Sequence, residues 1–125
     1  MARSLTVLKT RRDFLACSRA RRAGSKGLNL QAREREADET PGDEVRVGFT
    51  CSKKVGNAVA RNRAKRRLRV VASDVLRTAG QPGWDYVLIG RPGTTASRPF
   101  TKLLSDLEYC LEHIHAPAPR KRGAA

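Results

Sequence analysis

The stretch SKKVGNAVARNRAKRRLR, residues 52–69, decides how the rest of the chain is organised. It contains eight Lys or Arg residues, and no Asp or Glu occurs between Glu44 and Asp74. From Asn57 onward, small and aliphatic residues recur at helical spacing, which predicts a helix ending near 78–80 with Asn57 as its N-cap. The predicted apolar stripe consists of Ala60, Ala64, Leu68, Val71 and Val75.

The opposite side of this predicted helix is cationic. Arg61 and Lys65, like Lys65 and Arg69, are like charges at i,i+4 spacing, and each such pair costs about 0.2–0.5 kcal/mol in an isolated helix. A polyanion with closely spaced phosphates would offset this repulsion. The alternative is a solvated charged face, but such faces normally mix both signs of charge. The pattern therefore favours nucleic-acid binding.

The composition agrees with that interpretation. The chain has 125 residues, a formal net charge of +14 and a sequence pI of about 11.0, which is typical of a nucleic-acid binder. Only 5% of its residues are aromatic, so we expect phosphate contacts and shape recognition instead of base stacking. The length predicts one domain over residues 1–116, which would carry the nucleic-acid binding, followed by a disordered basic tail over 117–125.

The three cysteines are Cys17, Cys51 and Cys110, and no two have the spacing of zinc ligands. An odd number far apart is a poor disulfide framework, so we interpret them as buried thiols in a reducing compartment. The first residues lack the pattern of a signal peptide, and no apolar run approaches the length of a membrane span. We therefore expect a cytoplasmic protein.

Around the central stretch, the pattern predicts helix, strand, strand, helix, strand, helix. Residues 1–9 are interpreted as a basic lead-in. The first helix begins at a capping pair, Thr10 and Asp13, and runs to about Arg22, where Gly24 ends it. The strands are expected near 28–32, 45–51 and 84–89, the last buried on both faces. Pro99 begins the last helix, whose apolar stripe is Phe100, Leu103, Leu104, Leu107, Leu111 and Ile114.

This order predicts an α+β fold, a two-layer α/β sandwich in which helices cover a small mixed sheet. The acidic segment 34–44 is interpreted as a solvated connection between two strands. A metal-binding acidic patch is the alternative for that segment, although its carboxylates have no fixed ligand spacing.

The sequence contains no catalytic constellation of its own. His113 and His115 cannot face each other on a regular helix, and we interpret them as exposed histidines. Cys110 with His113 lacks the further ligands that a metal needs. The acids Asp106, Glu108 and Glu112 are interpreted as surface positions. We therefore predict no catalytic residue and no metal ligand.

Three segments together resemble the signature of the bacterial ribonuclease P protein subunits. They are VRVGF at 45–49, SKKVGNAV at 52–59, and RNRAKR at 61–66 with Arg69, and the resemblance extends from about Leu5 to Ile114. It implies a ribosomal-protein-like fold and a partner, the large catalytic RNA of ribonuclease P. Together the two remove the 5′ leader from precursor tRNA. It also implies that the RNA performs the endonucleolytic hydrolysis with Mg²⁺, that the protein holds no cofactor tightly, and that the protein alone is inactive.

The resemblance also implies roles for individual residues. The family's basic helix docks on the catalytic RNA, a role that falls here on Lys53, Lys54, Asn57, Arg61, Asn62, Arg63, Lys65, Arg66 and Arg69. The single-stranded leader lies in a cleft between the first helix and the sheet, which places Phe14, Gln31, Arg11 and Ser18 near it. Relatives often have an aromatic residue in place of Ser18 and Tyr in place of Gln31, so this cleft should depend more on hydrogen bonds and charge. Arg67 stands where relatives are often apolar, and we expect its stem beside the core stripe.

Two other functions fit the composition. A ribosomal protein that binds ribosomal RNA is the main alternative, because small basic α/β domains are common there. A DNA-binding regulator would place the basic helix in a major groove, but the helix face is too uniformly Lys and Arg to read bases. We expect neither DNA nor a membrane as a partner.

Overall fold

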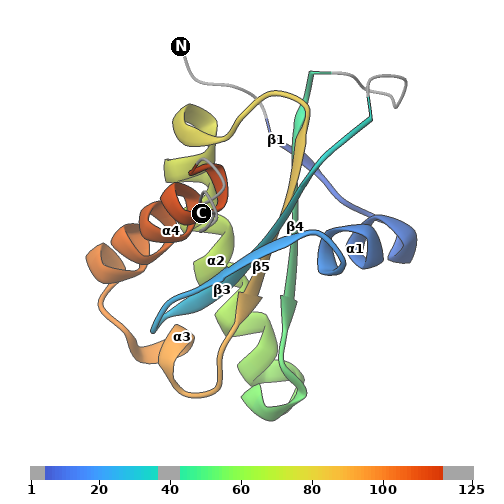
Figure 1. Cartoon of the computed structure of the whole chain (residues 1–125). Helices are drawn as coiled ribbons and strands as arrows, with labels where there is room; N and C mark the ends of the chain where they lie inside the picture. The colour runs from blue at the N-terminus through green and yellow to red at the C-terminus, as the bar shows by residue number, and fades with distance from the viewer. Residues whose placement is uncertain (1–4, 37–42, 117–125) are drawn as a thin grey trace, which may run out of the picture.

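The computed structural model describes residues 5–36 and 43–116 (Figure 1). The predicted tail 117–125 and the centre of the acidic connection, 37–42, lie outside the described residues. The elements, in chain order, are β1 (Leu5–Val7), α1 (Arg11–Ser18), β2 (Arg21–Gly24), β3 (Leu28–Glu34), β4 (Val45–Cys51), the 3-10 helix η1 (Lys53–Val55), α2 (Ala58–Ala79), β5 (Trp84–Gly90), α3 (Thr94–Ser97) and α4 (Phe100–His115).

The strands form one mixed five-stranded sheet in the order β1-β4-β5-β3-β2. β4 runs parallel to both β1 and β5, whereas β3 runs antiparallel to β5 and to β2. The long helix α2 connects the parallel neighbours β4 and β5. α2 and α4 cover one face of the sheet, and the short α1 lies on the other (Figure 1). The predicted α+β class with a mixed sheet is confirmed.

The main core lies between the sheet and the pair α2 and α4. Strand residues that alternate along β3, β4 and β5 point into it, because successive side chains of a strand face opposite sides. The helices add the predicted stripes, of which Ala64, Leu68, Val71, Val75, Leu103, Leu107, Leu111 and Ile114 are buried. A much smaller cluster, Leu8, Cys17 and Val87, lies beneath α1. The two faces of the sheet therefore differ greatly in apolar contact.

The predicted helix starts are confirmed. The Asn57 side chain accepts a hydrogen bond from Ala60 N at 3.0 Å, which caps the first turn of α2. The Thr10 hydroxyl accepts from Asp13 N at 3.2 Å and caps α1 in the same way. α2 ends at Ala79 and α4 begins at Phe100, as the patterns predicted.

The predicted end of the first helix was wrong. α1 stops at Ser18, and 21–24 is a strand that pairs with β3. The run of arginines resembles a helix face, but pairing with the outer edge of β3 satisfies backbone groups on both segments, and this tertiary gain overrides local propensity. The lead-in also contains β1, whose three residues are too short to show an alternating pattern. The structure thus has two more strands than the predicted order.

Several side chains differ in burial from the prediction. Asp106 is not a surface residue, because it is 8% exposed and accepts two hydrogen bonds from the Arg98 guanidinium. His115 is half-buried, with Nε2 2.7 Å from the Tyr86 hydroxyl, whereas His113 is exposed as expected. Cys17 and Cys110 are buried, but Cys51 is only half-buried. Interior placement of these polar groups required specific partners that a periodicity pattern does not reveal.

Two arginines illustrate the same point. Arg67 Nη1 donates to the carbonyl of Thr95 at 2.9 Å, so this half-buried side chain fastens α2 to the connection before α4. Arg35, at the start of the supposedly solvated connection, is only 6% exposed.

None of the helices in the described segments is long and apolar enough to cross a bilayer.

Candidate nucleic-acid interface

The cationic residues predicted to bind RNA lie together along η1 and the first three turns of α2. We call this set the cationic front, and it consists of Lys53, Lys54, Asn57, Arg61, Asn62, Arg63, Lys65, Arg66 and Arg69. Arg61 and Lys65 are half-buried, and the others are exposed. Within 5–36 and 43–116, no carboxylate forms an ion pair with any of them. The front therefore presents uncompensated positive charge to solvent.

The entry to α2 is built by backbone contacts. The Ser52 hydroxyl accepts from Lys54 N at 3.2 Å, which shapes η1. Gly56 has φ 133°, a conformation that favours glycine, and it turns the chain from η1 into α2. Arg61 Nη1 donates back to Gly56 O at 2.8 Å, and the Cys51 thiol lies 3.7 Å from Arg61 O. These contacts fix the start of the cationic front relative to the end of β4.

One member of the front also covers apolar surface. The Arg69 guanidinium carbon lies 5.6 Å from the centre of the Phe49 ring, within the range of a cation–π contact. Phe49 packs against the main core, so this arginine contributes to packing as well as to surface charge. Arg66 has no such contact and is simply exposed.

The face of the sheet toward α1 consists of rows that cross β3, β5 and β4. The strand registers define a first row, Arg33–Asp85–Arg46, a second row, Gln31–Val87–Gly48, and a third row, Asn29–Ile89–Thr50. Because neighbouring strands lie about 4.8 Å apart, the outer members of a row are separated by about 10 Å. The third row adjoins Cys51 and Ser52, which lead into η1. This sheet face therefore runs from beneath α1 toward the beginning of the cationic front.

Two of the residues predicted to contact a leader, Phe14 and Gln31, lie near opposite ends of the second row. Gln31 belongs to the row, and Phe14 lies on α1 with its ring against Gly48. The Phe14 ring packs against Gly48, since a Cβ atom at Gly48 would approach Phe14 Cζ to 2.6 Å. Gln31 pairs with Val87, which lies between Gln31 and Gly48. Gln31 also lines a surface hollow of about 300 Å³ together with Arg22, Asn29 and Ile89. Gln31, Asn29, Ile89 and Arg22 around this hollow form an open strip, and it adjoins the small cluster against which Phe14 packs. Val87 and Gly48, between Gln31 and Phe14, are buried.

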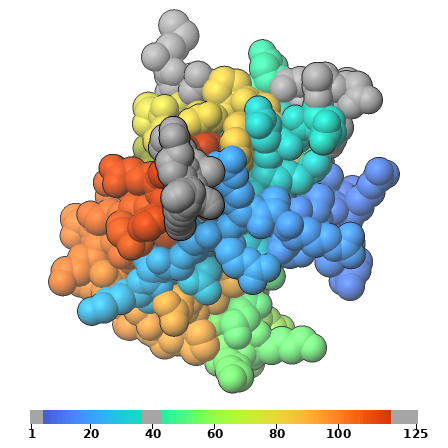
Figure 2. Space-filling model, viewed as in Figure 1, coloured from blue at the N-terminus to red at the C-terminus, as the bar shows by residue number. Residues whose placement is uncertain are grey.

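Arg11 and Ser18 lie at opposite ends of α1. Arg11 is exposed in the first turn, whereas Ser18 is the last residue and donates its hydroxyl to Leu15 O at 2.7 Å. The spacing of 11, 14 and 18 places them on one side of the helix with Phe14 between them. Figure 2 shows α1 and the start of α2 projecting on the same side of the molecule, with a hollow between them.

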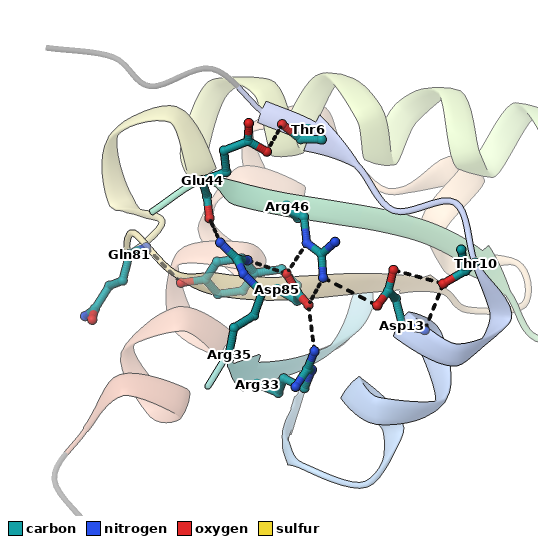
Figure 3. A network of polar contacts seen from close by, with 10 residues as sticks. Thr6, Thr10, Asp13, Arg33, Arg35, Glu44, Arg46, Gln81 and Asp85 are labelled. Carbon is teal, nitrogen blue, oxygen red and sulfur yellow. Dashed lines mark hydrogen bonds and ion pairs between the residues drawn. The ribbon is translucent and has the colours of Figure 1, made fainter. Parts of the chain in front are cut away.

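The first row contains a buried carboxylate that the sequence did not single out. Asp85 is fully buried, and its oxygens receive hydrogen bonds from Arg35 at 2.5 Å and from Arg46 at 2.7 and 2.8 Å (Figure 3). Arg33 lies 3.5 Å from it. Hydrogen bonding to Asp85 raises the pKa of Arg46 above its usual range. Such multiple pairing is what a carboxylate needs to remain charged inside a protein.

The Cys17 thiol, which lies between α1 and the sheet, is expected to be unreactive. Burial raises the pKa of Cys17 to about 12, and the nearby Asp85 carboxylate adds to the effect. Cys17 is therefore a small packing residue, as the sequence predicted. Among the described residues, moreover, no group of three His, Cys, Asp or Glu side chains is placed to hold a metal ion.

Sequence reasoning missed Gly48, Asn29, Ile89 and Arg22 as parts of this surface. Alternation along 45–51 and 28–34 does place Gly48 and Asn29 on the sheet face that is opposite the main core. That signal could have found them once the strand registers were known. Arg22 could not be placed while its segment was taken for a helix.

A mixed sheet with one open face, beside a helix that carries uncompensated positive charge, defines a small α+β domain of the nucleic-acid-binding class. The family model for Ribonuclease P matches residues 2–115. The ribonuclease P protein component of Ruegeria pomeroyi is 63% identical over 115 residues, covering 92% of this chain and 90% of that protein. The component from Paramagnetospirillum magneticum is 46% identical over 117 residues, covering 93% and 87%. The chain belongs to the ribonuclease P family of protein components.

Solved structures support the fold. The RNase P protein of Staphylococcus aureus matches with a TM-score of 0.66 at 23% identity, covering 86% of this chain and 93% of that one. The RNase P protein from Thermotoga maritima matches with a TM-score of 0.65 at 24% identity, covering 82% and 91%. These likenesses show the fold. The family match and the curated relatives support the ribonuclease P prediction and not the ribosomal alternative.

Proposed function

We propose that this chain is the protein subunit of a ribonuclease P holoenzyme, and that it binds a large catalytic RNA and the 5′ leader of precursor tRNA. The observation that carries the proposal is the cationic front, because its exposed Lys and Arg side chains have no described carboxylate partner. Family membership supports this choice of partner.

The cationic front is the proposed docking surface for the catalytic RNA. Guanidinium groups suit this role because each can form two hydrogen bonds to phosphate oxygens, and binding releases counterions from the RNA. Contacts of this kind position a partner without reading its sequence. The front should therefore recognise the shape of a folded RNA.

The open strip of the sheet is the proposed site for the leader. Phe14 offers one ring for stacking, and Gln31, Asn29 and Arg22 offer hydrogen bonds and positive charge around the adjacent hollow. Arg11 stands exposed at the start of α1, where it can meet a phosphate. The chemical groups of this strip suit a single strand of little fixed sequence.

Hydrolysis is assigned to the RNA partner. The proposal places Mg²⁺ there, as the family resemblance implies. The protein's own groups position the catalytic RNA and the precursor. Cytoplasmic location, where tRNA is processed in bacteria, is part of the same proposal.

Reconstitution tests the proposal. We expect purified protein alone to cleave nothing, and we expect its addition to the catalytic RNA to lower the Mg²⁺ concentration needed for precursor cleavage. Cleavage by nuclease-free protein without RNA would contradict the assignment of catalysis. An unchanged Mg²⁺ requirement would contradict the subunit role.

Salt dependence tests the docking surface separately. Arg66→Ala and Arg69→Ala should each weaken binding to the catalytic RNA and reduce the slope of log K against log salt by about 1. Arg77→Ala removes an exposed cation from the same helix beyond the front, and it should leave the slope unchanged. Equal slopes in all three variants and the unmodified protein would contradict docking through the cationic front.

A further inference from the structure

Asp85 is buried directly beside the proposed leader strip, although it does not line it. Its side chain is 0% exposed, and it occupies the middle of the first row, between Arg33 on β3 and Arg46 on β4. Its neighbour on the same face of β5 is Val87, the centre of the second row. Asp85 therefore cannot contact a leader itself, but it lies one row from the residues proposed to do so.

Arg46 connects this carboxylate to α1. Its guanidinium donates through Nε and Nη2 to the two oxygens of Asp85, at 2.7 and 2.8 Å, and Nη2 also lies 3.4 Å from Asp13 Oδ1 (Figure 3). Two hydrogen bonds to one carboxylate fix the plane of the guanidinium, so the direction in which its free N–H bonds point is also fixed. That direction is toward the first turn of α1.

Asp13 carries the connection into the helix. Its backbone N–H donates to the Thr10 hydroxyl, and that hydroxyl donates to Asp13 Oδ2 at 2.9 Å. The residue that Arg46 holds is thus part of the N-terminal cap of α1. Any movement of Arg46 would act on the start of the helix, where Phe14 follows directly.

Phe14 meets the same strand two residues farther along. Its ring lies against Gly48, and Arg46 and Gly48 share a face of β4. α1 therefore touches β4 at two successive positions, first through an ion pair and then through a ring. Apolar contact on this face is limited to the cluster of Leu8, Cys17 and Val87 with Phe14 and Ile89 packed beside it. Besides this cluster, the ion pair between Arg46 and Asp13 is a directional contact that holds α1 to the sheet.

We propose that Asp85 is a positioning residue for the leader site: through Arg46 and Asp13 it sets where α1 sits over the sheet, and so where the Phe14 ring meets a single-stranded leader. The inference rests on the proposed function, because a leader must bind at this strip. It adds a buried residue that controls selectivity for precursor over mature tRNA. This chain has Ser18 and Gln31 where further rings could stand, so it depends on the placement of Phe14.

The main variant is Asp85→Asn, which keeps the shape of the side chain and removes its charge. With the holoenzyme at low temperature, we expect the ratio of affinities for precursor and mature tRNA to fall about three- to tenfold. Affinity for the catalytic RNA should not change, because the cationic front lies on other elements.

Asp106→Asn is the matched control. Asp106 is also a buried carboxylate held by a guanidinium, with Arg98 Nε at 2.6 Å, but it belongs to α4 on the opposite side of the sheet from α1. A general loss of stability would affect both variants alike. A selectivity ratio that falls equally in both, or in neither, would overturn the inference.

Asp13→Asn keeps the test decisive if Asp85→Asn does not fold. It removes the charge at the half-buried end of the same connection and leaves the interior intact. We expect it to lower the selectivity ratio in the same direction. In an Asp85→Asn background that does fold, Asp13→Asn should have little further effect, since both act through one connection. Full additivity of the two losses would contradict that connection.

A spectroscopic measurement separates this inference from the proposed function. Fluorophenylalanine labels all three Phe residues, and Phe14→Leu identifies the Phe14 signal in the ¹⁹F spectrum. Asp85→Asn should shift or broaden that signal without any RNA present, whereas Asp106→Asn should not. An unmoved signal overturns the positioning role. A moved signal with no leader preference in the unmodified holoenzyme would instead overturn the proposed leader site.

Discussion

The two faces of the sheet are built by different means. Toward α2 and α4, the sheet buries a continuous apolar core that includes Leu68, Tyr86 and Leu107. Toward α1, it presents a row of charged residues around Asp85, a small apolar cluster, and an open strip. Apolar contact is insensitive to direction, whereas charge pairs and a ring on a glycine require particular positions. The first face therefore supplies most of the stability, and the second places the groups that would meet RNA.

The largest effect should come from matched leucine truncations on the two faces. Leu107→Ala in the main core should lower the free energy of unfolding by about 3–5 kcal/mol, because its many neighbours cannot all collapse into the cavity. Leu8→Ala beneath α1 should cost about 2–3 kcal/mol, since the smaller cluster lies near solvent and can relax. Urea denaturation measures both.

Equal losses in the free energy of unfolding for these two truncations would show that both faces contribute equally to stability. A larger cost at Leu8 would reverse the comparison.

Gly48→Ala should come next in size. A methyl group at this position would lie 2.6 Å from Phe14 Cζ, so the Phe14 ring must shift, alone or together with α1. We expect a loss of about 1–3 kcal/mol in the free energy of unfolding and weaker binding of precursor tRNA but not of mature tRNA.

Gly90→Ala is the control for that substitution on the other face, where the added methyl would lie 2.9 Å from Cys51 Sγ. It should affect stability without changing the preference for precursor. A loss of preference in both variants would mean that the strip has no special connection to the leader.

An aromatic residue at the end of α1 should have a smaller effect of opposite sign. Ser18→Phe adds a ring on the side of α1 that carries Phe14, and stacking at this partly exposed position should tighten binding of a long-leader precursor by about 1 kcal/mol, roughly fivefold. Mature tRNA should bind as before. Filter binding or fluorescence titration of the holoenzyme measures both affinities.

Ser105→Phe is the matched control, because Ser105 likewise donates its hydroxyl to a carbonyl in its own helix and lies on α4. If Ser18→Phe tightened the binding of precursor and mature tRNA equally, the result would contradict the proposal that the leader binds at the strip.

The smallest expected effect is a pH dependence of the free energy of unfolding, and it arises at His115 on the side of the sheet toward α2 and α4. Burial lowers the pKa of His115, and the positive charge of Arg21 adds to this, while Glu34 acts in the opposite direction. The unfolded chain then binds a proton at higher pH than the folded one, so the free energy of unfolding falls as pH drops below about 6.5. His115→Gln should flatten this dependence in denaturation curves from pH 5 to 7.

The sequence predicted the face of the sheet toward α2 and α4 better than the face toward α1. Val45, Val47 and the stripes of α2 and α4 repeat at regular intervals, so periodicity alone located them. Asp85 lies within the nearly apolar run 84–89, and its hydrogen-bonding partners Arg46 and Arg35 are 39 and 50 residues away in the sequence. No local pattern connects them.

The open strip was predicted only in part. Phe14 and Gln31 came from the family resemblance, and the structure places Gln31 at one end of the second row and the Phe14 ring against the other end, whereas Gly48 and Arg22 needed the strand registers. β2 stayed hidden because its pairing with β3, and not its own residues, makes it a strand. The cationic front needed no tertiary information, since a gap without acids from 45 to 73 is visible in the sequence itself.

The central claim is that the cationic front docks on a folded RNA. The most direct measurement is the affinity of the Arg66→Glu, Arg69→Glu double variant for the catalytic RNA of ribonuclease P, alongside its free energy of unfolding. We predict an affinity lower by about a hundredfold or more at low salt. The stability should change little, because relief of like-charge repulsion in α2 offsets loss of the Arg69 contact with Phe49. Unchanged affinity in a folded double variant would contradict the claim.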